Sequence, residues 1–361
     1  VTLDDTVIWK HTFQHLPKVD LTTGTVWQYR AVEAFDTTGA GLTGYTMNYA
    51  DASEPWTSIG VKTDTTGTFE IGLKNTQKTT DVQVSKSWEM DEDDRFATRT
   101  NSVDVKLQWS TTPTDATSWA DVTGTGFTAT VTLDDSNSWT HIFENLPIAD
   151  KSNDELYYRV VEVKVPYGYV ESYNPAYIKA ETVQKGSPLA LKVTNTLEKD
   201  DLTITKNWDD QNNDYGTRPA SIYVKLQWNR VVTPAAAWSD VVETVNGTTG
   251  IVTVTLYDNN QWSHTFTNLP KYDPDNGNAL EYRVVEAFSS TVDGLEGYTL
   301  TNAATGETWA IDGKDLKAGD PDLKLENKQR LTAINVKKLW EDNNDLYAVR
   351  PQTLDVTLEW N

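Results

Sequence analysis

Hydrophobic and polar residues alternate in short runs along this chain, and clusters of Asp, Asn, Gly and Pro separate the runs. Side chains of a β-strand point alternately to opposite faces, so the pattern predicts half-buried strands joined by turns. No segment shows the periodicity of a long helix, whereas Thr, Val and aromatic residues, which favour strands, are plentiful. The pattern therefore predicts an all-β protein.

A lysine interrupts the hydrophobic face of a predicted strand at three places. Lys86 follows Val84 by two residues and precedes Trp88 by two, so the three side chains share one face. Lys206 and Lys338 lie in the same way between an aliphatic residue and a tryptophan. An unpaired ammonium group on a buried face costs several kcal/mol. Each lysine therefore needs a buried partner or a chemical role.

Other motifs repeat together with the lysines. Successive lysines lie about 120 and about 130 residues apart, a period that suits whole domains better than solenoid repeats. The chain is therefore expected to be an array of homologous domains. A Trp-x-His-x-Phe-x-x-Leu-Pro motif starts at Trp9, Trp139 and Trp262, and a Tyr-Arg-x-Val-Glu motif starts at Tyr29, Tyr158 and Tyr282.

The repeats divide the chain into four parts. Residues 81–200 and 201–330 are expected to be complete domains. Residues 1–80 lack a lysine strand and begin with a sequence that matches the interior of the next repeat. Residues 331–361 hold only the lysine strand and the strand after it. We expect two partial domains at the ends, in a window on a longer protein or in a piece that neighbours complete.

Each repeat also places a glutamate and an asparagine on a hydrophobic face. Glu162 shares its face with Tyr158 and Val160, four and two residues earlier. An asparagine follows alternating hydrophobic residues in the last long strand of the repeat in the same way. The glutamates are Glu33, Glu162 and Glu286, and the asparagines are Asn75, Asn195 and Asn327.

A lysine, a glutamate and an asparagine in one dry core can react. Burial disfavours charged groups, so the pKa of the lysine falls and the pKa of the glutamate rises. The neutral amine can attack the carboxamide carbon while the glutamate transfers protons, and ammonia leaves. The product is an isopeptide bond, and enforced proximity can supply ~7–11 kcal/mol of the barrier. The alternative is a buried Lys–Glu ion pair that the asparagine amide completes.

The order of motifs in residues 206–327 resembles the collagen-adhesin B-type (CnaB) domains of Gram-positive surface adhesins and pilins. It runs from Lys-x-Trp through Asp-Asp-Gln-Asn-Asn-Asp-Tyr-Gly-Thr-Arg-Pro and Asn-Leu-Pro-Lys-Tyr-Asp to Tyr-Arg-Val-Val-Glu and Gly-Tyr. Residues 86–195 match with departures, since Thr100 stands where the other repeat has Pro219. The resemblance covers essentially the whole chain.

This resemblance implies tandem inverse-immunoglobulin, transthyretin-like β-sandwich domains. It also implies a bond between the first-strand lysine and the last-strand asparagine, with the inward glutamate as catalyst. The implied sets are Lys86, Asn195 and Glu162, and Lys206, Asn327 and Glu286.

The expected function is a structural stalk or fibre segment of a cell-surface adhesin or pilus-like filament, outside the cell and attached to its wall. Bond formation would be autocatalytic, without turnover, so the chain is not expected to be an enzyme acting on an external substrate. The alternative is a module that binds a glycan or a host protein, and such a ligand could also bind elsewhere in the full protein. Outward clusters of tryptophan would favour binding, and inward tryptophans would favour the stalk.

Charge and composition narrow the partners. The net charge of −22 argues against nucleic acid and anionic membrane surfaces. No apolar run approaches ~18 residues, so no membrane insertion is expected in this segment. Cysteine is absent, so disulfides cannot stabilise the domains. His11, His141 and His264 occupy one equivalent position, and no second histidine or cysteine recurs with them in every repeat, so no metal or cofactor is expected.

The two partial domains are complementary. Residues 331–361 supply Lys338, and residues 1–80 supply Glu33 and Asn75. Head-to-tail copies of the chain could therefore rebuild a domain between molecules and bond Lys338 to Asn75 of the next copy. The alternative is that neighbouring repeats of one continuous polypeptide are joined by ordinary peptide connections.

Overall fold

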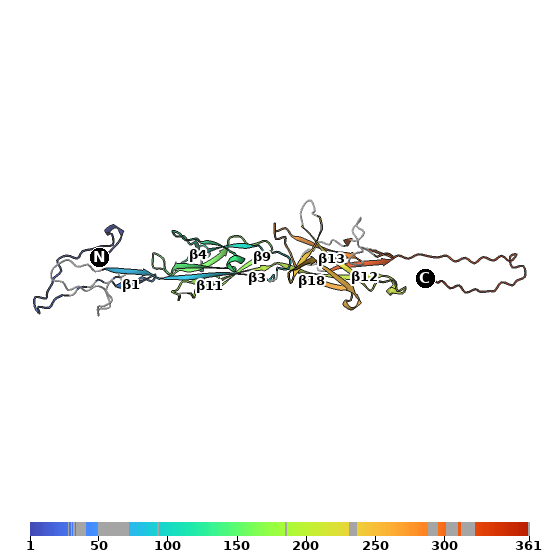
Figure 1. Cartoon of the computed structure of the whole chain (residues 1–361), viewed down its shortest axis with the longest axis horizontal. Helices are drawn as coiled ribbons and strands as arrows, with labels where there is room; N and C mark the ends of the chain where they lie inside the picture. The colour runs from blue at the N-terminus through green and yellow to red at the C-terminus, as the bar shows by residue number, and fades with distance from the viewer. Residues whose placement is uncertain are drawn as a thin grey trace.

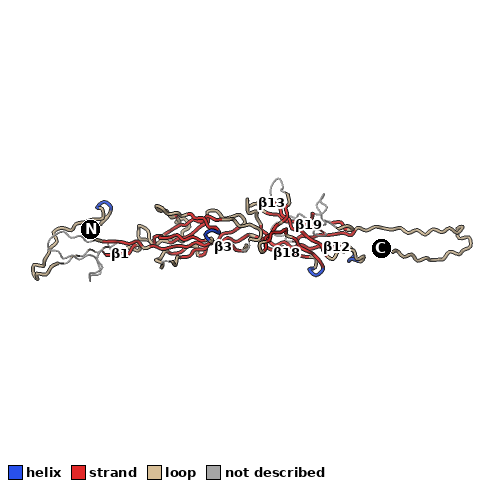
Figure 2. The backbone as a smooth tube through the Cα atoms, in the orientation of Figure 1, coloured by secondary structure: helices blue, strands red, loops and turns tan. Residues whose placement is uncertain are grey.

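The protein forms two β-sandwiches that follow one another along an elongated molecule (Figure 1). The structure is a computed structural model that describes residues 1–27, 29, 31, 33, 41–49, 72–91, 94–184, 186–230, 237–287, 295–300, 310–311 and 322–359. Strands dominate the described residues (Figure 2), and the only helices among them are short 3-10 turns. The all-β prediction is confirmed. The turns are η1 (Asp5–Val7), η2 (Asp135–Asn137), η3 (Gln211–Asn213) and η4 (Asp258–Asn260).

The first sandwich consists of two facing sheets. The sheet that carries Lys86 has the order β7 (Thr140–Pro147), β3 (Thr79–Glu89), β11 (Leu189–Leu197) and β9 (Tyr169–Asn174). The facing sheet has the order β10 (Ile178–Lys179), β8 (Tyr157–Glu162), β4 (Ser102–Ser110) and β5 (Ala120–Asp121), and β6 (Thr130–Asp134) also pairs with β4.

The second sandwich repeats this order, as the repeated motifs predict. Its lysine sheet runs β18 (Ser263–Pro270), β12 (Lys199–Asp209), β22 (Asp322–Gln329) and β20 (Tyr298–Leu300). The facing sheet runs β14 (Ser239–Asp240), β13 (Ser221–Arg230), β19 (Leu280–Ala287) and β21 (Ala310–Ile311), with β17 (Thr253–Tyr257) beside β13. A separate hairpin joins β15 (Val242–Val245) to β16 (Thr248–Ile251).

The first and last strands of each sandwich lie side by side and run parallel. In the first sandwich β3 pairs with β11, which places Val193 opposite Lys86 and Asn195 opposite Trp88. In the second, β12 pairs with β22 in the same register. Parallel neighbours need a long connection, and here the rest of the domain supplies it. Residues more than a hundred positions apart in the sequence therefore become neighbours.

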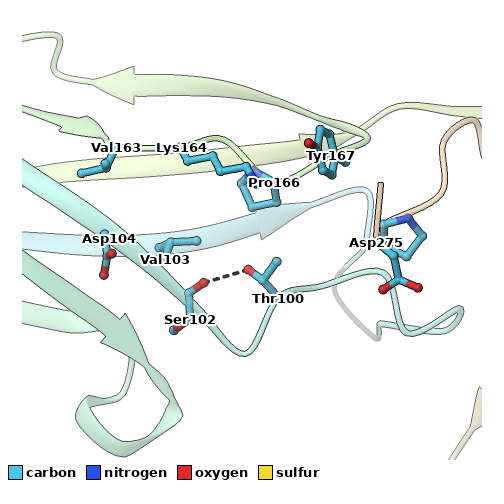
Figure 3. Close-up of a pocket in the computed structure, with 10 residues that line it drawn as sticks. Thr100, Ser102, Val103, Asp104, Val163, Lys164, Pro166, Tyr167 and Asp275 are labelled. Carbon is cyan, nitrogen blue, oxygen red and sulfur yellow. Dashed lines mark hydrogen bonds between the residues drawn. The ribbon is translucent and has the colours of Figure 1, made fainter. Parts of the chain in front are cut away.

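The two sandwiches contact each other directly. Tyr167 of the first sandwich and Asp275 of the second both line a cavity of about 410 Å³ (Figure 3). On another side, the Arg95 guanidinium forms an ion pair with Glu243, which lies in β15.

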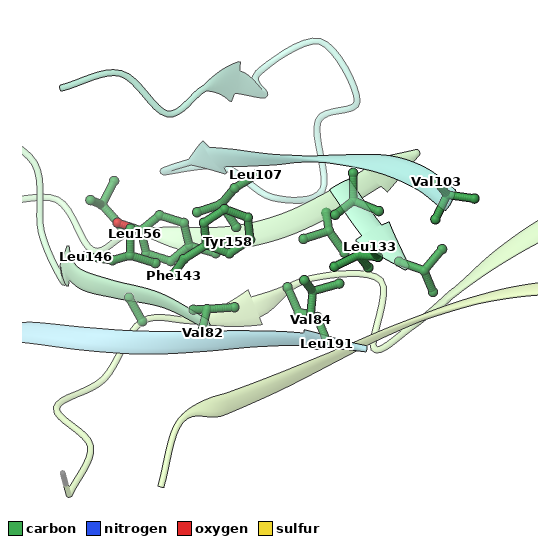
Figure 4. Packing of buried hydrophobic residues seen from close by; sticks show 14 of the residues in the cluster. Val82, Val84, Val103, Leu107, Leu133, Phe143, Leu146, Leu156, Tyr158 and Leu191 are labelled. Carbon is green, nitrogen blue, oxygen red and sulfur yellow. The ribbon is translucent and has the colours of Figure 1, made fainter. Parts of the chain in front are cut away.

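Each sandwich has its own hydrophobic core. In the first core, Val82 and Val84 on β3 face Leu107 on β4 and Tyr158 on β8 (Figure 4). Burial alternates along β3 as the sequence pattern predicts. Full burial of a side chain such as Leu107 contributes roughly 1.5–3 kcal/mol.

The terminal regions are not sandwiches in the described part of the chain. Near the N-terminus β1 (Tyr45–Tyr49) pairs with β2 (Leu73–Gln77). Residues 331–359 contain no strand, and Leu339 is 68% exposed. The sequence predicted a strand around Lys338, and this prediction is wrong for the isolated chain. A strand needs a neighbour to pair its backbone groups, and these residues extend beyond the second sandwich (Figure 1).

Candidate functional site

Each sandwich brings one lysine, one asparagine and one glutamate together in its interior. Lys86 lies on β3, Asn195 on the adjacent β11, and Glu162 on β8 of the facing sheet. Their exposed fractions are 7%, 0% and 8%. Strand alternation points all three side chains inward, and the packing of the two sheets makes them meet.

In the first sandwich the glutamate contacts the asparagine amide. Asn195 Nδ2 donates a hydrogen bond to Glu162 Oε1 at 3.0 Å. Lys86 Nζ donates to the carbonyl oxygen of Ser87 at 2.7 Å and lies 3.9 Å from the ring centroid of Trp88. Within the described part of the chain, the buried Asn195 Oδ1 and Glu162 Oε2 have no hydrogen-bond partner.

In the second sandwich the glutamate lies between the other two groups. Asn327 Nδ2 donates to Glu286 Oε1 at 2.6 Å, and Lys206 Nζ lies 3.8 Å from Glu286 Oε2. The side chains of Lys206 and Glu286 are 0% and 3% exposed. One carboxyl oxygen therefore faces the nitrogen of the carboxamide, and the other faces the amine.

Burial shifts both kinds of ionisable group towards their neutral forms. Desolvation lowers the pKa of Lys86 and of Lys206 to about 8, although the nearby glutamate charge opposes the shift. Desolvation likewise raises the pKa of Glu162 and of Glu286, against the opposing effect of the lysine. An amine with a pKa of about 8 is neutral in roughly a tenth of molecules at pH 7. Such an amine is a usable nucleophile.

An aspartate–arginine pair holds the tryptophan beside each lysine. Arg218 Nε and Nη2 donate to the two carboxyl oxygens of Asp210 at 2.8 and 2.6 Å. The Arg218 guanidinium lies 5.5 Å from the ring centroid of Trp208, and Lys206 Nζ lies 4.1 Å from it. Sequence reasoning missed this pair. The signal was an aspartate and an arginine eight residues apart in every repeat, at Asp91 and Arg99, Asp210 and Arg218, and Asp342 and Arg350.

The third set of predicted residues is not brought together within one chain. Asn75 Nδ2 donates to Glu33 Oε1 at 2.6 Å, so two of its members meet. Lys338 is exposed, and the C-terminal segment that carries it lies at the opposite end of the molecule (Figure 1).

Other kinds of site are not seen in the described residues. Across the described ranges, no group of three or more His, Asp or Glu side chains could hold a metal ion. No helix among them is long and apolar enough to cross a membrane.

The model of the family described as the Cna protein B-type domain matches residues 82–196 and 202–303. The chain belongs to this family of β-sandwich domains. It is also 28% identical, over 355 residues, to a collagen adhesin of Staphylococcus aureus. That alignment covers 97% of this chain and 22% of the adhesin, so the chain spans about a fifth of the length of this relative.

Solved structures of related domains align with the chain. A single B repeat unit of the collagen-binding surface protein of S. aureus is 24% identical, covers 70% of this chain and 99% of its own, and gives a TM-score of 0.25. The major pilin from Streptococcus pyogenes is 15% identical, covers 70% of this chain and 98% of its own, and gives a TM-score of 0.35. The family assignment rests on the family model.

Proposed function

We propose that this chain is a stalk segment of a cell-surface adhesin or pilus-like filament, and that each complete repeat is locked by an autocatalytic isopeptide bond. The complete repeats are residues 81–200 and 201–330. The bonds join Lys86 to Asn195 and Lys206 to Asn327. The observation that carries the proposal is the buried glutamate, which touches the asparagine amide in both sandwiches.

The reaction balances with the groups present. Neutral Lys206 Nζ attacks Asn327 Cγ, and a protonated Glu286 holds the proton that the carboxamide nitrogen needs in order to leave. The Nζ–Cγ bond forms and the Cγ–Nδ2 bond breaks. Oε2 of Glu286 accepts a proton from the amine, and Oε1 gives one to the departing nitrogen, which leaves as ammonia. Glu286 ends in its starting protonation state.

The position of the bond suits a load-bearing stalk. The first strand, β3, enters the first sandwich from the preceding region, and the last strand, β11, leads into the next sandwich. A covalent link between them would carry tension past the rest of the domain. It would also close a loop of about 110 residues, which the loop-entropy model equates with roughly 4–5 kcal/mol of stabilisation. Such a link would replace the missing disulfides.

The tryptophans of the two sandwiches favour a stalk over a glycan platform. Trp88 and Trp262 are 9% and 8% exposed. The partly buried tryptophans that pack against the two cores are Trp109, Trp139, Trp208 and Trp228. A host or glycan ligand, if the full protein has one, would then bind somewhere other than these buried tryptophans. Location on the cell surface and attachment to the wall are proposed by analogy with the family.

Intact mass spectrometry tests the bonds. We expect the mass of the folded chain to be lower than the sequence mass by two molecules of ammonia. Glu162→Ala and Glu286→Ala should each restore one ammonia. The matched control is Glu171→Ala, because Glu171 is the strand partner of Asn195 but its side chain is exposed.

The outcomes separate the covalent proposal from its alternative. A wild-type chain that folds normally with its full sequence mass would contradict the bonds and leave a buried Lys–Glu ion pair. Peptide mapping of the digested wild-type chain should recover Lys86 joined to Asn195. A loss of ammonia mapped to other asparagines would also contradict the proposal.

A further inference from the structure

The joints between successive units are built from the same two parts. One part is the turn that ends in Gly-Tyr, and the other is the loop that follows Asn-Leu-Pro in the next unit. Between the two sandwiches, the carbonyl oxygen of Gly168 accepts the Glu198 N–H at 2.8 Å. The carbonyl oxygen of Glu198 then accepts the Lys271 N–H at 3.1 Å. Turn, linker and loop are thus connected by backbone hydrogen bonds.

The N-terminal region contacts the first sandwich in the same way. The carbonyl oxygen of Gly44 accepts the Lys78 N–H at 2.8 Å. A Cβ on Gly44 would lie 3.3 Å from the Ala149 Cβ, and a Cβ on Gly168 would lie 3.6 Å from the Tyr272 Cβ. Each turn glycine therefore lies directly against the loop of the following unit.

Several positions differ between the joints, and two of them meet each other across both joints. One is the residue before the turn glycine, which is Thr43 in the first joint and Tyr167 in the second. The other is a loop residue in the left-handed region, which is Asn153 with φ +70° in the first joint and Gly277 with φ +75° in the second. Asparagine and glycine are the residues that adopt this conformation most readily.

In the first joint the loop residue binds the turn through its side chain. Asn153 Oδ1 accepts the backbone N–H of Thr43 at 2.6 Å. Asn153 Nδ2 donates to the carbonyl oxygen of Gly41 at 3.2 Å. A glycine at position 153 would lose both bonds.

In the second joint the loop residue makes room for a ring. A Cβ on Gly277 would lie only 2.5 Å from Cδ1 and 2.9 Å from Cε1 of Tyr167. Any side chain at position 277 therefore requires the Tyr167 ring, which is 42% exposed, or the whole domain to move. The cavity beside Tyr167 and Pro274 (Figure 3) shows that this side of the joint is not closely packed. An overlap at position 277 would therefore act on this loosely packed side of the joint.

We propose that these two positions form a matching pair that fixes the orientation of each repeat on the next and selects which repeats can be neighbours. In the first joint the backbone N–H of residue 43 binds the Asn153 side chain, and in the second the Tyr167 ring occupies the space that a side chain at position 277 would fill. The second sandwich carries the same turn, with Glu296 before Gly297, whose carbonyl oxygen accepts the Arg330 N–H at 2.7 Å. A repeat that docks there needs a loop residue that fits Glu296. The contacts between neighbouring repeats are noncovalent and do not depend on the isopeptide bonds.

Residual dipolar couplings of the whole chain test the proposal, because rigidly joined sandwiches share one alignment tensor. We expect a shared tensor in the wild type and two different tensors in Gly277→Asn. Adding Tyr167→Thr should restore the shared tensor, because it recreates the pair of the first joint. The matched control is Gly216→Asn, since Gly216 has φ +64° and nothing within 4 Å of an added Cβ.

A shared tensor in the single variant Gly277→Asn would overturn the proposal, as would a double variant that stays misaligned. Amide chemical shifts of the core strands report separately whether each sandwich is folded. If Gly277→Asn unfolds the second sandwich, Asn153→Gly tests the first joint. That variant removes the two hydrogen bonds of Asn153 and adds no atoms that could clash, so it should loosen the N-terminal region from the first sandwich. Unchanged amide shifts at Thr43 would contradict the proposal.

Discussion

Lys206 and Lys338 share a Lys-x-Trp motif but have very different surroundings. Both lie over the tryptophan two residues later, with Nζ 4.1 Å from the Trp208 centroid and 4.7 Å from the Trp340 centroid. Lys206 is 3% exposed, whereas Lys338 is exposed and Trp340 is 40% exposed. Only Lys206 has a parallel neighbour strand and a facing sheet.

The local contacts form without the domain. Arg350 donates to Asp342 and lies 5.7 Å from the ring centroid of Trp340, as Arg218 does beside Trp208. The lysine, tryptophan, arginine and aspartate of this cluster are close in sequence, so the cluster also forms where no sheet is present. Burial and the meeting with glutamate and asparagine depend on the complete sandwich. The contrast teaches that the motif determines the contacts between lysine, tryptophan and arginine, and that the fold determines the burial of the lysine and its partners from distant strands.

The largest effect is expected from removing the acceptor of one bond. Asn327→Ala should lower the free energy of unfolding of the second sandwich by roughly 4–5 kcal/mol, because the unfolded chain regains the freedom of a long loop. Guanidinium unfolding followed by tryptophan fluorescence measures the change, and intact mass confirms that one bond is missing.

The control for this prediction is Asn207→Ala, which changes an exposed asparagine on β12. It should keep both bonds and unfold like the wild type. Equal losses in the two variants would mean that no covalent link stabilises the second sandwich.

The next effect concerns the pH dependence of bond formation. A photocaged lysine at position 206 can be uncaged in denaturant, and dilution at a chosen pH then starts folding and reaction together. The reactive form has a neutral Lys206 and a protonated Glu286. The rate should peak between the raised pKa of Glu286 and the pKa of about 8 of Lys206.

Above that peak Lys206 is already neutral, and each further pH unit lowers the protonated fraction of Glu286 about tenfold. The rate should therefore fall about tenfold per pH unit. Mass spectra of quenched samples follow the release of ammonia. A rate that keeps rising up to the pKa of an ordinary lysine would contradict the buried acid–base pair.

A smaller effect should distinguish the two sandwiches. Arg218 binds both oxygens of Asp210, whose side chain is 0% exposed, so Arg218→Gln should cost about 1.5–3 kcal/mol. Arg99 Nη2 donates to the carbonyl oxygen of Asp91, and Arg99 Nε lies 3.6 Å from its carboxylate, so Arg99→Gln removes no close carboxylate bond and should cost less. Unfolding curves of the two variants measure the difference. Equal costs would show that the carboxyl contacts do not set the contribution of the arginine.

The smallest effect within one chain is expected at the C-terminal segment. Lys338→Ala should leave the mass deficit and the unfolding of both sandwiches unchanged, because the described chain gives Lys338 no glutamate or asparagine partner.

At high concentration, head-to-tail pairing with Glu33 and Asn75 of a second copy stays a prediction. Covalent ladders on denaturing gels that vanish in Lys338→Ala would support it, and a chain that stays monomeric would contradict it.

The sequence predicted the faces of the strands well. Val84, Lys86 and Trp88 are buried in β3 as the alternation requires, and Glu162 is buried at the end of β8. The sequence did not predict that residues 331–359 would lack strands, because alternation describes what a strand would bury and not whether a neighbour is present. It also missed the role of Asp210 and Arg218, whose type and spacing are common on protein surfaces.

What the sequence determined by itself is therefore local or repeated. It set the all-β class, the repeat period, and the inward positions of Lys206, Glu286 and Asn327, because side-chain direction in a strand follows from a two-residue period. The tertiary structure decided which strands are neighbours, and so placed Asn327 opposite Trp208 and Glu286 across the core. It also decided that Tyr167 meets Gly277. These contacts join residues far apart in the chain, and only the packing of whole sheets and domains determines them.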